Sequence, residues 1–261
     1  NPTSEFRGTP FWAWNTELDK QELLWQIDIF KEMGLGGFHM HSRSGLATEY
    51  LSDKFMEMVK ACAGKAEKEG MLCWLYDEDR WPSGAAGGIV TKEMQYRARY
   101  LLFTSISYDK FDVNVLSEGN ESAMGSRTNQ GTLLARYEVV LKDGLLNSFR
   151  RLKDHEEISP EGTEWFAYLE IASTSAWFNN QAYLNTLDRK SVERFIEVTH
   201  ERYKEIVGDK FGGVIPAIFT DEPQFTHKTS FGFAEDTNDM IIPYSDAFEA
   251  DFKQLYGSSF L

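Results

Sequence analysis

The sequence has few cysteines, fewer basic than acidic residues, and no long apolar run. Two cysteines occur in 261 residues, Cys62 and Cys73, and both have apolar neighbours. We expect them to be buried free thiols, which favours a reducing, cytoplasmic compartment over the periplasm. No apolar run approaches the roughly 18 residues of a membrane-spanning helix, which argues against a membrane protein.

Basic residues are too few for a polyanionic partner. Lys and Arg number 27 against 41 Asp and Glu, which gives a formal net charge of −14. Nucleic-acid phosphates need neutralisation by Lys and Arg, so this charge argues against nucleic-acid binding. The same charge argues against attraction to an anionic membrane surface. We therefore expect neither nucleic acid nor a membrane as a partner.

Apolar and aromatic residues, by contrast, are plentiful. Hydrophobic residues make up 42% of the chain, and aromatic residues make up 14%. This composition supports a sizeable core, and the length has room for one large domain or for a domain that carries an insertion. The seven tryptophans are compatible with stacking on sugar rings and equally compatible with core packing.

The first third of the chain alternates strands and helices with short loops. Apolar residues recur at helical spacing in 18–34, where Asp19 is a candidate N-cap, and in a second helix that begins at Ser52 or Asp53. Strands are predicted from short apolar runs at 8–15, 35–40 and 71–76. This order predicts an α/β fold with a parallel sheet or barrel.

The pattern changes in the middle of the chain. From 99 to 178, apolar residues alternate in period two, as in 133–141. Asp143-Gly144, which lies between two such runs, is typical of a tight β-hairpin turn. We therefore predict that 99–178 is an antiparallel β insertion between 1–98 and 179–261, which together form the α/β domain.

The α/β rhythm resumes after the insertion. Asp188 is a candidate cap for a helix that closes near Gly208, and an apolar strand is predicted at 213–219. A last helix is predicted at 244–256. Four to five parallel strands result. A complete (β/α)8 barrel needs about 250 residues, and the insertion takes up a substantial part of this chain, which is therefore too short for eight strands. The sequence therefore predicts the N-terminal half of a TIM-barrel-type domain.

Three of the predicted strands end in polar residues, and the first of these ends is His39-Met40-His41. Side chains alternate along a strand, so both histidines face the same way. Such a pair can hold a metal ion, as in metal-dependent amidohydrolases. The alternative is two hydrogen-bonding histidines that line a polar pocket. That alternative is favoured because no third His or Lys stands at a comparable strand end.

The second strand end carries the acidic run Asp77-Glu78-Asp79, followed by Trp81. In α/β folds, polar sites form where buried strands end, which makes these carboxylates candidates for binding a sugar or a cation, or for a protonation step. Their oxygens would suit Ca²⁺, and the Trp81 ring could stack on a sugar. The alternative is a structural role in salt bridges to Arg80 or Arg43.

The third strand end, Asp221-Glu222-Pro223, is the sharpest single signal. Glycoside hydrolysis needs two carboxyl groups that flank the scissile bond, one of which donates a proton. A Glu at the mouth of an apolar strand is desolvated, and Asp221 adds a like charge; both effects favour the protonated form that a donor needs. Glu222 is therefore the candidate general acid. The alternative is a surface acid before a loop.

Several stretches together resemble the bacterial α-L-rhamnosidase-like glycoside hydrolases, glycoside hydrolase family 106 and its relatives. The stretches lie at 10–15, 36–41, 74–84, 199–203 and 220–223, in the expected order along nearly the whole chain. The run Asp77-Glu78-Asp79 followed by Trp81-Pro82-Ser83-Gly84 is the most specific of them. The resemblance implies a (β/α)8 catalytic domain with a β-rich insertion, which cleaves a glycosidic bond of a plant or bacterial oligosaccharide.

The resemblance also implies roles for single residues. It implies Glu222 as the acid and calcium as a candidate ligand, and we expect Trp14 and Trp81 to be stacking walls for the sugar. The carbohydrate-binding set that we predict is Trp14, His39, His41, Asp77, Glu78, Asp79, Trp81 and Asp221. Asp221 stands where retaining barrel glycosidases carry Asn, so the hydrogen bond of that Asn to a sugar hydroxyl is not carried over. The partner carboxylate in such enzymes comes from later strands.

Two other functions stay open at the level of the sequence. One is a sugar-binding module without turnover, which would bind a sugar but not hydrolyse it. The other is a metal-dependent hydrolase built on His39 and His41, which would hold a stoichiometric transition metal.

Overall fold

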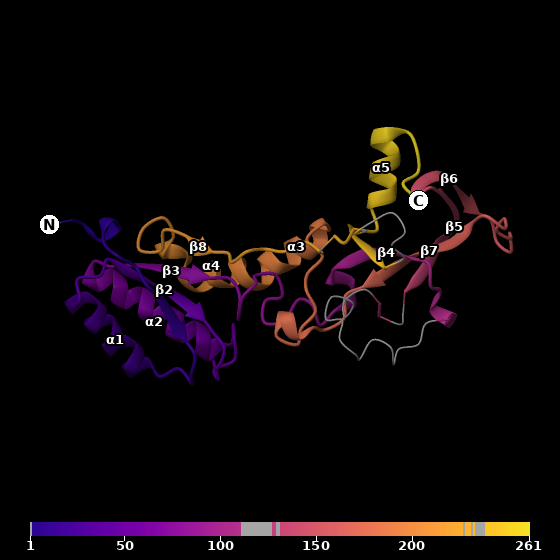
Figure 1. Cartoon of the computed structure of the whole chain (residues 1–261). Helices are drawn as coiled ribbons and strands as arrows, with labels where there is room; N and C mark the ends of the chain where they lie inside the picture. The colour runs from indigo at the N-terminus through magenta and orange to yellow at the C-terminus, as the bar shows by residue number, and fades with distance from the viewer. Residues whose placement is uncertain (1, 111–126, 129–130, 227, 231, 233–237) are drawn as a thin grey trace. The chain divides into compact units, whose positions relative to one another are not determined.

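The chain folds into two compact units, each with its own sheet (Figure 1). The computed structural model describes residues 2–110, 127–128, 131–226, 228–230, 232 and 238–261. Unit 1 comprises Asn1–Glu93, Ser175–Leu184 and Arg189–Gln224. Unit 2 comprises Met94–Thr174, Asn185–Asp188 and Phe225–Leu261.

Unit 1 contains a parallel sheet in the order β1-β2-β3-β8. Its strands are β1 Phe11–Trp14, β2 Gly37–Ser42, β3 Leu72–Tyr76 and β8 Ile218–Phe219. Its helices are α1 Lys20–Glu32, α2 Asp53–Glu69, α3 Arg189–Ile196 and α4 Arg202–Val207, with the π-helical turn Glu197–Glu201 between the last two. Short 3₁₀ turns lie at Ser4–Phe6, Ala176–Phe178 and Gly208–Lys210. The described residues thus form a mixed α/β unit with four parallel strands, and a closed barrel is not seen among them.

Helices α1 and α2 begin at residues whose side chains cap them. Asp19 Oδ1 accepts a hydrogen bond from the backbone N–H of Glu22 at 2.9 Å, and Ser52 Oγ accepts one from Phe55 at 3.2 Å. Gly70 follows α2 with a φ of 66°, a left-handed conformation that glycine adopts without steric penalty. The predicted cap at Asp19 is confirmed, and Ser52 is the cap of the second helix.

The core of unit 1 includes one face of strand β1. Trp12 and Trp14 are buried while their neighbours along β1 are exposed, as expected for a strand with one face on a core. Trp14 is 1% exposed, and its ring contacts Trp12 and Phe55 edge-on, with centroids 5.6 and 5.5 Å apart. The expectation that Trp14 stacks on a sugar is therefore wrong, because the core covers its ring.

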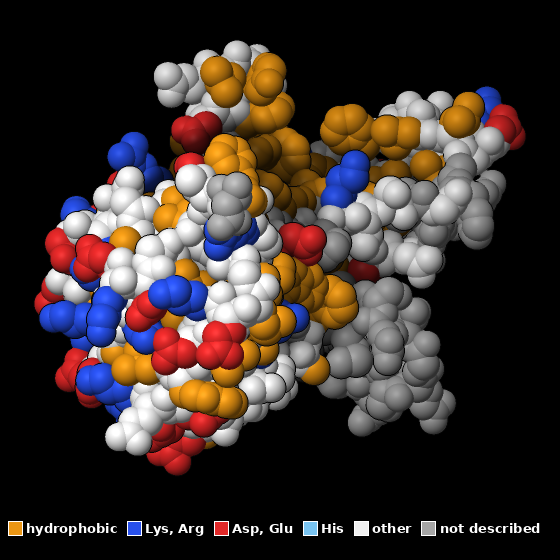
Figure 2. All heavy atoms as spheres, turned by 90° about the vertical axis from the view of Figure 1, so that its left-hand side faces the viewer, with side chains coloured by type: hydrophobic (Ala, Val, Ile, Leu, Met, Phe, Trp, Pro, Cys, Tyr) orange, Lys and Arg blue, Asp and Glu red, His pale blue; other side chains and the backbone are white. Residues whose placement is uncertain are grey.

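Ion pairs on the surface add little to this core. Lys20 pairs with Glu57 at 3.1 Å, and Lys65 pairs with Asp28 at 2.5 Å, both between α1 and α2. Figure 2 shows acidic and basic side chains intermixed on the face turned to the viewer. Exposed pairs contribute at most about 1 kcal/mol each, so the apolar contacts hold the helices on the sheet. None of the helices in the described ranges combines the length and hydropathy needed to cross a membrane.

Strand β8 is shorter than the sequence predicts. Hydrogen bonds run from the N–H groups of Cys73, Leu75 and Asp77 to the carbonyls of Val214, Ala217 and Phe219, at 2.9, 3.4 and 3.3 Å. The donors Cys73 and Leu75 are two residues apart on β3, whereas their acceptors Val214 and Ala217 are three residues apart. Pro216 lies in that interval and has no N–H to donate, so the regular ladder is restricted to Ile218–Phe219.

Unit 2 is built on an antiparallel sheet in the order β6-β5-β7-β4-β9. Its strands are β4 Arg99–Thr104, β5 Thr132–Lys142, β6 Leu145–Leu152, β7 Thr163–Ile171 and β9 Met240–Tyr244. It also holds α5 Phe248–Tyr256 and the 3₁₀ turns Met94–Tyr96 and Tyr108–Lys110. Asp143 and Gly144 join β5 to β6 with φ of 53° and 75°, as a primed hairpin turn requires. The predicted antiparallel strands between 99 and 178 are confirmed.

The C-terminal part of the chain differs from the expectation that 179–261 continues the α/β region. Strand β9 pairs antiparallel with β4, with Ile242 opposite Leu101. Tyr244 is buried and belongs to the same apolar cluster as Leu101. The apolar β9 therefore covers the edge of β4, and residues 225–261 belong to unit 2.

Candidate functional site

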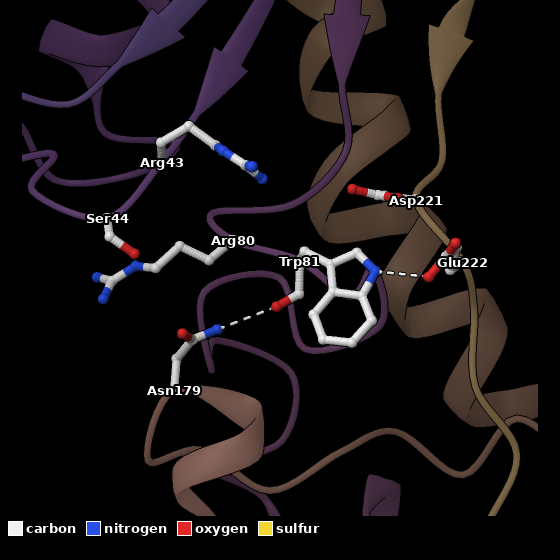
Figure 3. Close-up of a pocket in the computed structure, with 7 residues that line it drawn as sticks. All are labelled: Arg43, Ser44, Arg80, Trp81, Asn179, Asp221 and Glu222. Atoms are coloured by element: carbon white, nitrogen blue, oxygen red, sulfur yellow. Dashed lines mark hydrogen bonds between the residues drawn. The ribbon is translucent and has the colours of Figure 1, made fainter.

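The C-terminal ends of β2, β3 and β8 meet at a pocket of about 570 Å³ (Figure 3). Parallel strands bring these ends to one edge of a sheet, where α/β folds place polar sites. The pocket is lined by Arg43, Ser44, Arg80, Trp81, Asn179, Asp221 and Glu222. Of the residues predicted to form the site, Trp81, Asp221 and Glu222 thus lie together.

Glu78 does not line the pocket, because the loop after β3 folds around its carboxylate. Five backbone N–H groups donate to it: to Oε1 from Asp79 at 2.9 Å and Gly87 at 2.5 Å, and to Oε2 from Gly84 at 2.9 Å, Ala85 at 2.7 Å and Ala86 at 2.7 Å. Glu78 is 1% exposed. Burial raises the pKa of Glu78 to about 7, although the backbone donors oppose this rise. The expectation that Glu78 binds sugar is corrected: it anchors the loop.

Asp77 also has an internal role. Its Oδ1 accepts a hydrogen bond from Ser83 Oγ at 2.6 Å. Its Oδ2 accepts from Thr220 Oγ1 at 2.6 Å and lies 3.0 Å from His200 Nε2. Asp77 is fully buried, so its carboxylate contacts these three partners and is not accessible to a substrate. Asp77 therefore joins the loop after β3, the end of β8 and the π-helical turn, which is a correction of its expected role in sugar binding.

Ser83 connects the two acidic runs directly. Its N–H donates to the Asp221 carbonyl at 2.8 Å, and its Oγ accepts from the Asp221 N–H at 2.9 Å. The Tyr183 hydroxyl donates to the Ser83 carbonyl and accepts from the Gln224 N–H at 2.8 Å. The backbone is thus held on both sides of Glu222. These contacts fix the position of Asp221 and Glu222 at the pocket.

Glu222 adopts a backbone conformation that needs such support. Its φ is 43°, in the left-handed region that disfavours side chains with a Cβ by about 1–2 kcal/mol. Its Oε2 accepts a hydrogen bond from the Trp81 indole N–H at 2.9 Å (Figure 3). The side chain is exposed within the described residues, so the desolvation expected from its apolar strand is not found there. Trp81 is held in turn by Asn179, whose amide donates to the Trp81 carbonyl at 3.2 Å.

Asp221 lies between cationic and acidic groups. Burial raises the pKa of Asp221, the nearby Glu222 charge adds to the rise, and the Arg43 guanidinium opposes it. Its Oδ2 lies 4.0 Å from His41 Nε2. Figure 3 shows the side chains of Arg43 and Asp221 extending toward one another. Asp221 is therefore a polar wall of the pocket, as its position in the sequence predicts.

The two histidines of β2 pack against aromatic rings and are not among the residues that line the pocket, so neither their expected contact with a sugar nor the alternative of two histidines that line a polar pocket is found there. His39 stacks on Trp74 with centroids 4.7 Å apart, and His41 stacks on Tyr76 at 3.8 Å. His41 Nδ1 lies 3.2 Å from the Ser42 carbonyl, which can only accept, so Nδ1 carries the hydrogen. Burial lowers the pKa of His41 to about 4. Among the described residues, no three His, Cys, Asp or Glu side chains form a group that could hold a metal ion.

The acidic run after β3 does not fit calcium. A cation needs free oxygen lone pairs, whereas the Glu78 carboxylate is surrounded by N–H donors. Asp77 accepts from two hydroxyl groups, and Asp79 Oδ2 accepts from Arg80 Nε at 3.0 Å. Burial raises the pKa of Asp79, and Arg80 opposes the rise. Protein donors thus occupy the carboxylates of this run. Asp79 forms a salt bridge to Arg80, which is the structural role that the sequence left open as the alternative.

Several residues of the site were given no role from the sequence. Ser83, Thr220 and Tyr183 carry no charge and belong to no periodic pattern of their own. His200 lies in a π-helical turn inside what reads as one continuous helix, so its position relative to Asp77 could not be derived from helical spacing. The available signal was the Pro82-Ser83-Gly84 loop, whose short polar and small residues favour close backbone approach.

Comparison with known proteins yields structural likeness at a distant level only. No family model matches the chain, and no curated protein matches it. Among solved structures, the chain is similar to a rhamnosidase from Novosphingobium sp. PP1Y, with 11% sequence identity and a TM-score of 0.48. The match covers 99% of this chain and 41% of that protein, so the chain spans less than half of its length. A likeness at this level is a distant structural relationship and not family membership.

Proposed function

We propose that this chain contributes the proton-donor side of a glycoside hydrolase active site of the α-L-rhamnosidase-like type. The observation that carries the proposal is the Glu222 carboxylate, which is exposed to a pocket and oriented by the Trp81 indole N–H at 2.9 Å. The pocket lies at the edge of a parallel sheet where such folds hold substrates. The residue types in it, a carboxylic acid beside an aromatic ring, suit a sugar and its glycosidic oxygen.

In the proposed reaction, Glu222 is the general acid. Its Oε2 is held by Trp81, so Oε1 carries the proton to the glycosidic oxygen as the bond to the anomeric carbon breaks. Trp81 lies against the sugar ring, and Asp221 accepts hydrogen bonds from hydroxyl groups. A second carboxylate is needed to attack the anomeric carbon or to activate water. We place it on further strands that complete a barrel, of which the parallel sheet described here would be the first half.

The proposal is tested by replacing the acid in the full-length protein. Glu222→Gln should lower the hydrolysis rate of a rhamnose-terminated oligosaccharide by a factor on the order of 10²–10⁴, because an amide cannot donate the proton. Glu201→Gln is the matched control, since Glu201 is exposed and pairs with Lys204 at 3.0 Å. Equal rates for the two variants would contradict the proposal.

A sugar-binding module without turnover would use the same pocket. The observation in its favour is that the two carboxylates among the seven lining residues stand on adjacent positions, Asp221 and Glu222. Two residues on one loop supply one side of a two-carboxylate site. Tight binding of the oligosaccharide by the full-length protein with no hydrolysis would establish the module and exclude the hydrolase.

A further inference from the structure

Trp177 is an exposed aromatic side chain that the proposed chemistry does not use. It is 60% exposed, and its ring meets that of Trp81 edge-on, with centroids 5.3 Å apart and an interplanar angle of 75°. Trp81 lines the pocket, so Trp177 extends the aromatic surface beyond it. Exposed apolar surface that continues from a polar pocket is typical of a ligand contact.

The turn that carries Trp177, residues 175–181, is held by many hydrogen bonds. Ser175 Oγ accepts from the Trp177 N–H at 3.2 Å, and the Ser175 carbonyl accepts from the Asn180 N–H at 2.8 Å. The Ser175 N–H donates to the Gln181 carbonyl at 3.0 Å. Asn179 and Asn180 both have left-handed φ, 57° and 61°. Asn tolerates this conformation better than most residues. The local sequence therefore builds a closed turn with Trp177 on its outside.

The same turn is anchored to the pocket. Phe178 stacks on Tyr183 with centroids 4.7 Å apart, and Tyr183 binds the backbone of Ser83. Asn179 donates to the Trp81 carbonyl (Figure 3). A flexible exposed tryptophan would lose conformational entropy when it binds a ligand, whereas an anchored one has already lost it. The backbone that carries Trp177 is thus held in place relative to Trp81 before any ligand arrives.

We propose that Trp177 is a second sugar-stacking surface, so that the ligand is an oligosaccharide whose chain extends from the pocket across Trp81 to Trp177. The inference rests on the proposed function and adds the substrate class to it. The C–H face of a pyranose ring is apolar, and an indole ring offers a broad, rigid partner for it. The two rings lie nearly at right angles, so they would contact two different sugar units of one chain.

The inference predicts a dependence of affinity on chain length. The probe is a series of rhamnose-terminated oligosaccharides of one to four sugar units, titrated calorimetrically into the full-length Glu222→Gln protein so that no ligand is consumed. Affinity should rise when the chain becomes long enough to reach Trp177. Adding Trp177→Ala should remove about tenfold in affinity from the longer ligands. Trp177→Phe should retain most of it, because a ring remains.

Trp25→Ala is the matched control, since Trp25 is 56% exposed on α1 and does not line the pocket. It should leave the length dependence unchanged. Equal affinity for all lengths in the parent protein, or an equal loss for short and long ligands in Trp177→Ala, would overturn the inference and leave the proposed function intact. Failure of every member of the series to bind the parent protein would overturn the proposed function, and this inference with it.

Discussion

Two acidic runs follow parallel strands in this chain, and they take opposite roles. Asp77-Glu78-Asp79 turns inward, and its carboxylates are bound by hydroxyl, backbone N–H and guanidinium donors. Asp221-Glu222 lines a pocket. The residues that follow each run explain the difference. The loop 84–87 consists of glycine and alanine, whose N–H groups can wrap around a carboxylate, whereas Pro223 has no N–H to donate. An acidic residue at a strand end can therefore contact a ligand only where the backbone N–H groups of the following loop do not bind its carboxylate.

The largest effect should follow from Glu78→Gln, which breaks the inward run. The variant replaces one carboxylate oxygen by an NH₂ group, which is a donor. Five backbone N–H groups then share a single acceptor oxygen in a buried space, and some of them lose their hydrogen bond. We expect the free energy of unfolding in urea to fall by about 3 kcal/mol or more. The exposed Glu201→Gln should change it by less than about 0.5 kcal/mol. Similar values for the two variants would remove the distinction between a loop anchor and a surface acid.

The next effect concerns His41, whose ring lies 4.0 Å from Asp221 Oδ2. Burial lowers its pKa from 6.5 to about 4. Between these two pH values the unfolded state binds a proton that the folded state does not. The stability that His41 contributes above pH 6.5 should therefore be lost as the pH falls through this window, by up to about 3 kcal/mol.

His41→Phe provides the comparison, because phenylalanine keeps a ring on Tyr76 and does not titrate. Urea unfolding of both proteins is measured at intervals from pH 7 to pH 4. The difference between their unfolding free energies should shift in favour of the variant as the pH falls. Curves that stay parallel would show that His41 has no pKa shift between the folded and unfolded states.

A smaller effect is expected at Gly84, where the loop after β3 packs against Tyr183. Gly84 has a φ of 149°, and an added Cβ would lie 2.5 Å from the Tyr183 ring carbon Cζ. Gly84→Ala should therefore lower the free energy of unfolding by about 2 kcal/mol. Gly64→Ala in α2 meets no atom within 4 Å and should raise it by about 0.5–1 kcal/mol. Thermal or urea unfolding of both variants checks the opposite signs.

Asp77→Asn should have the smallest effect on stability of the four. The amide keeps one acceptor oxygen, so one of the partners Ser83 and Thr220 retains its hydrogen bond. We expect a loss of about 1 kcal/mol in the free energy of unfolding. Ser83→Ala removes the same bond from the other side, and the double variant should lose less than the sum of the two. Strict additivity would show that the two residues do not interact.

The sequence predicted the parts of the fold that depend on local pattern. Helical spacing located α1 and α2, and Asp143-Gly144 located the hairpin between β5 and β6. The pairing of β9 with β4 joins residues far apart in the chain, and no local signal encodes it. The short ladder of β8 follows from Pro216 and from the register of β3, of which only the first is visible in the sequence.

The site was predictable to the extent that strand ends identify it. Trp81, Asp221 and Glu222 lie at the pocket because parallel strands end at one edge. Trp14 and Glu78 were wrongly assigned to the site. A tryptophan can pack in a core and a glutamate can anchor a loop, and residue type alone does not separate these roles from ligand binding. Trp177 was not singled out, since its exposure depends on a turn closed by backbone hydrogen bonds.

We propose that Glu222 performs the proton transfer and that Asp77 supports its position. The most direct measurement is hydrolysis by the full-length protein of two rhamnosides, one with an alkyl and one with a 4-nitrophenyl leaving group. Glu222→Gln should slow the alkyl rhamnoside by a factor on the order of 10²–10⁴ and the nitrophenyl rhamnoside much less. Asp77→Asn should slow both by a similar factor, because it displaces the acid without removing its proton. Equal slowing of both substrates by Glu222→Gln, or leaving-group dependence in Asp77→Asn, would contradict this assignment of roles to Glu222 and Asp77.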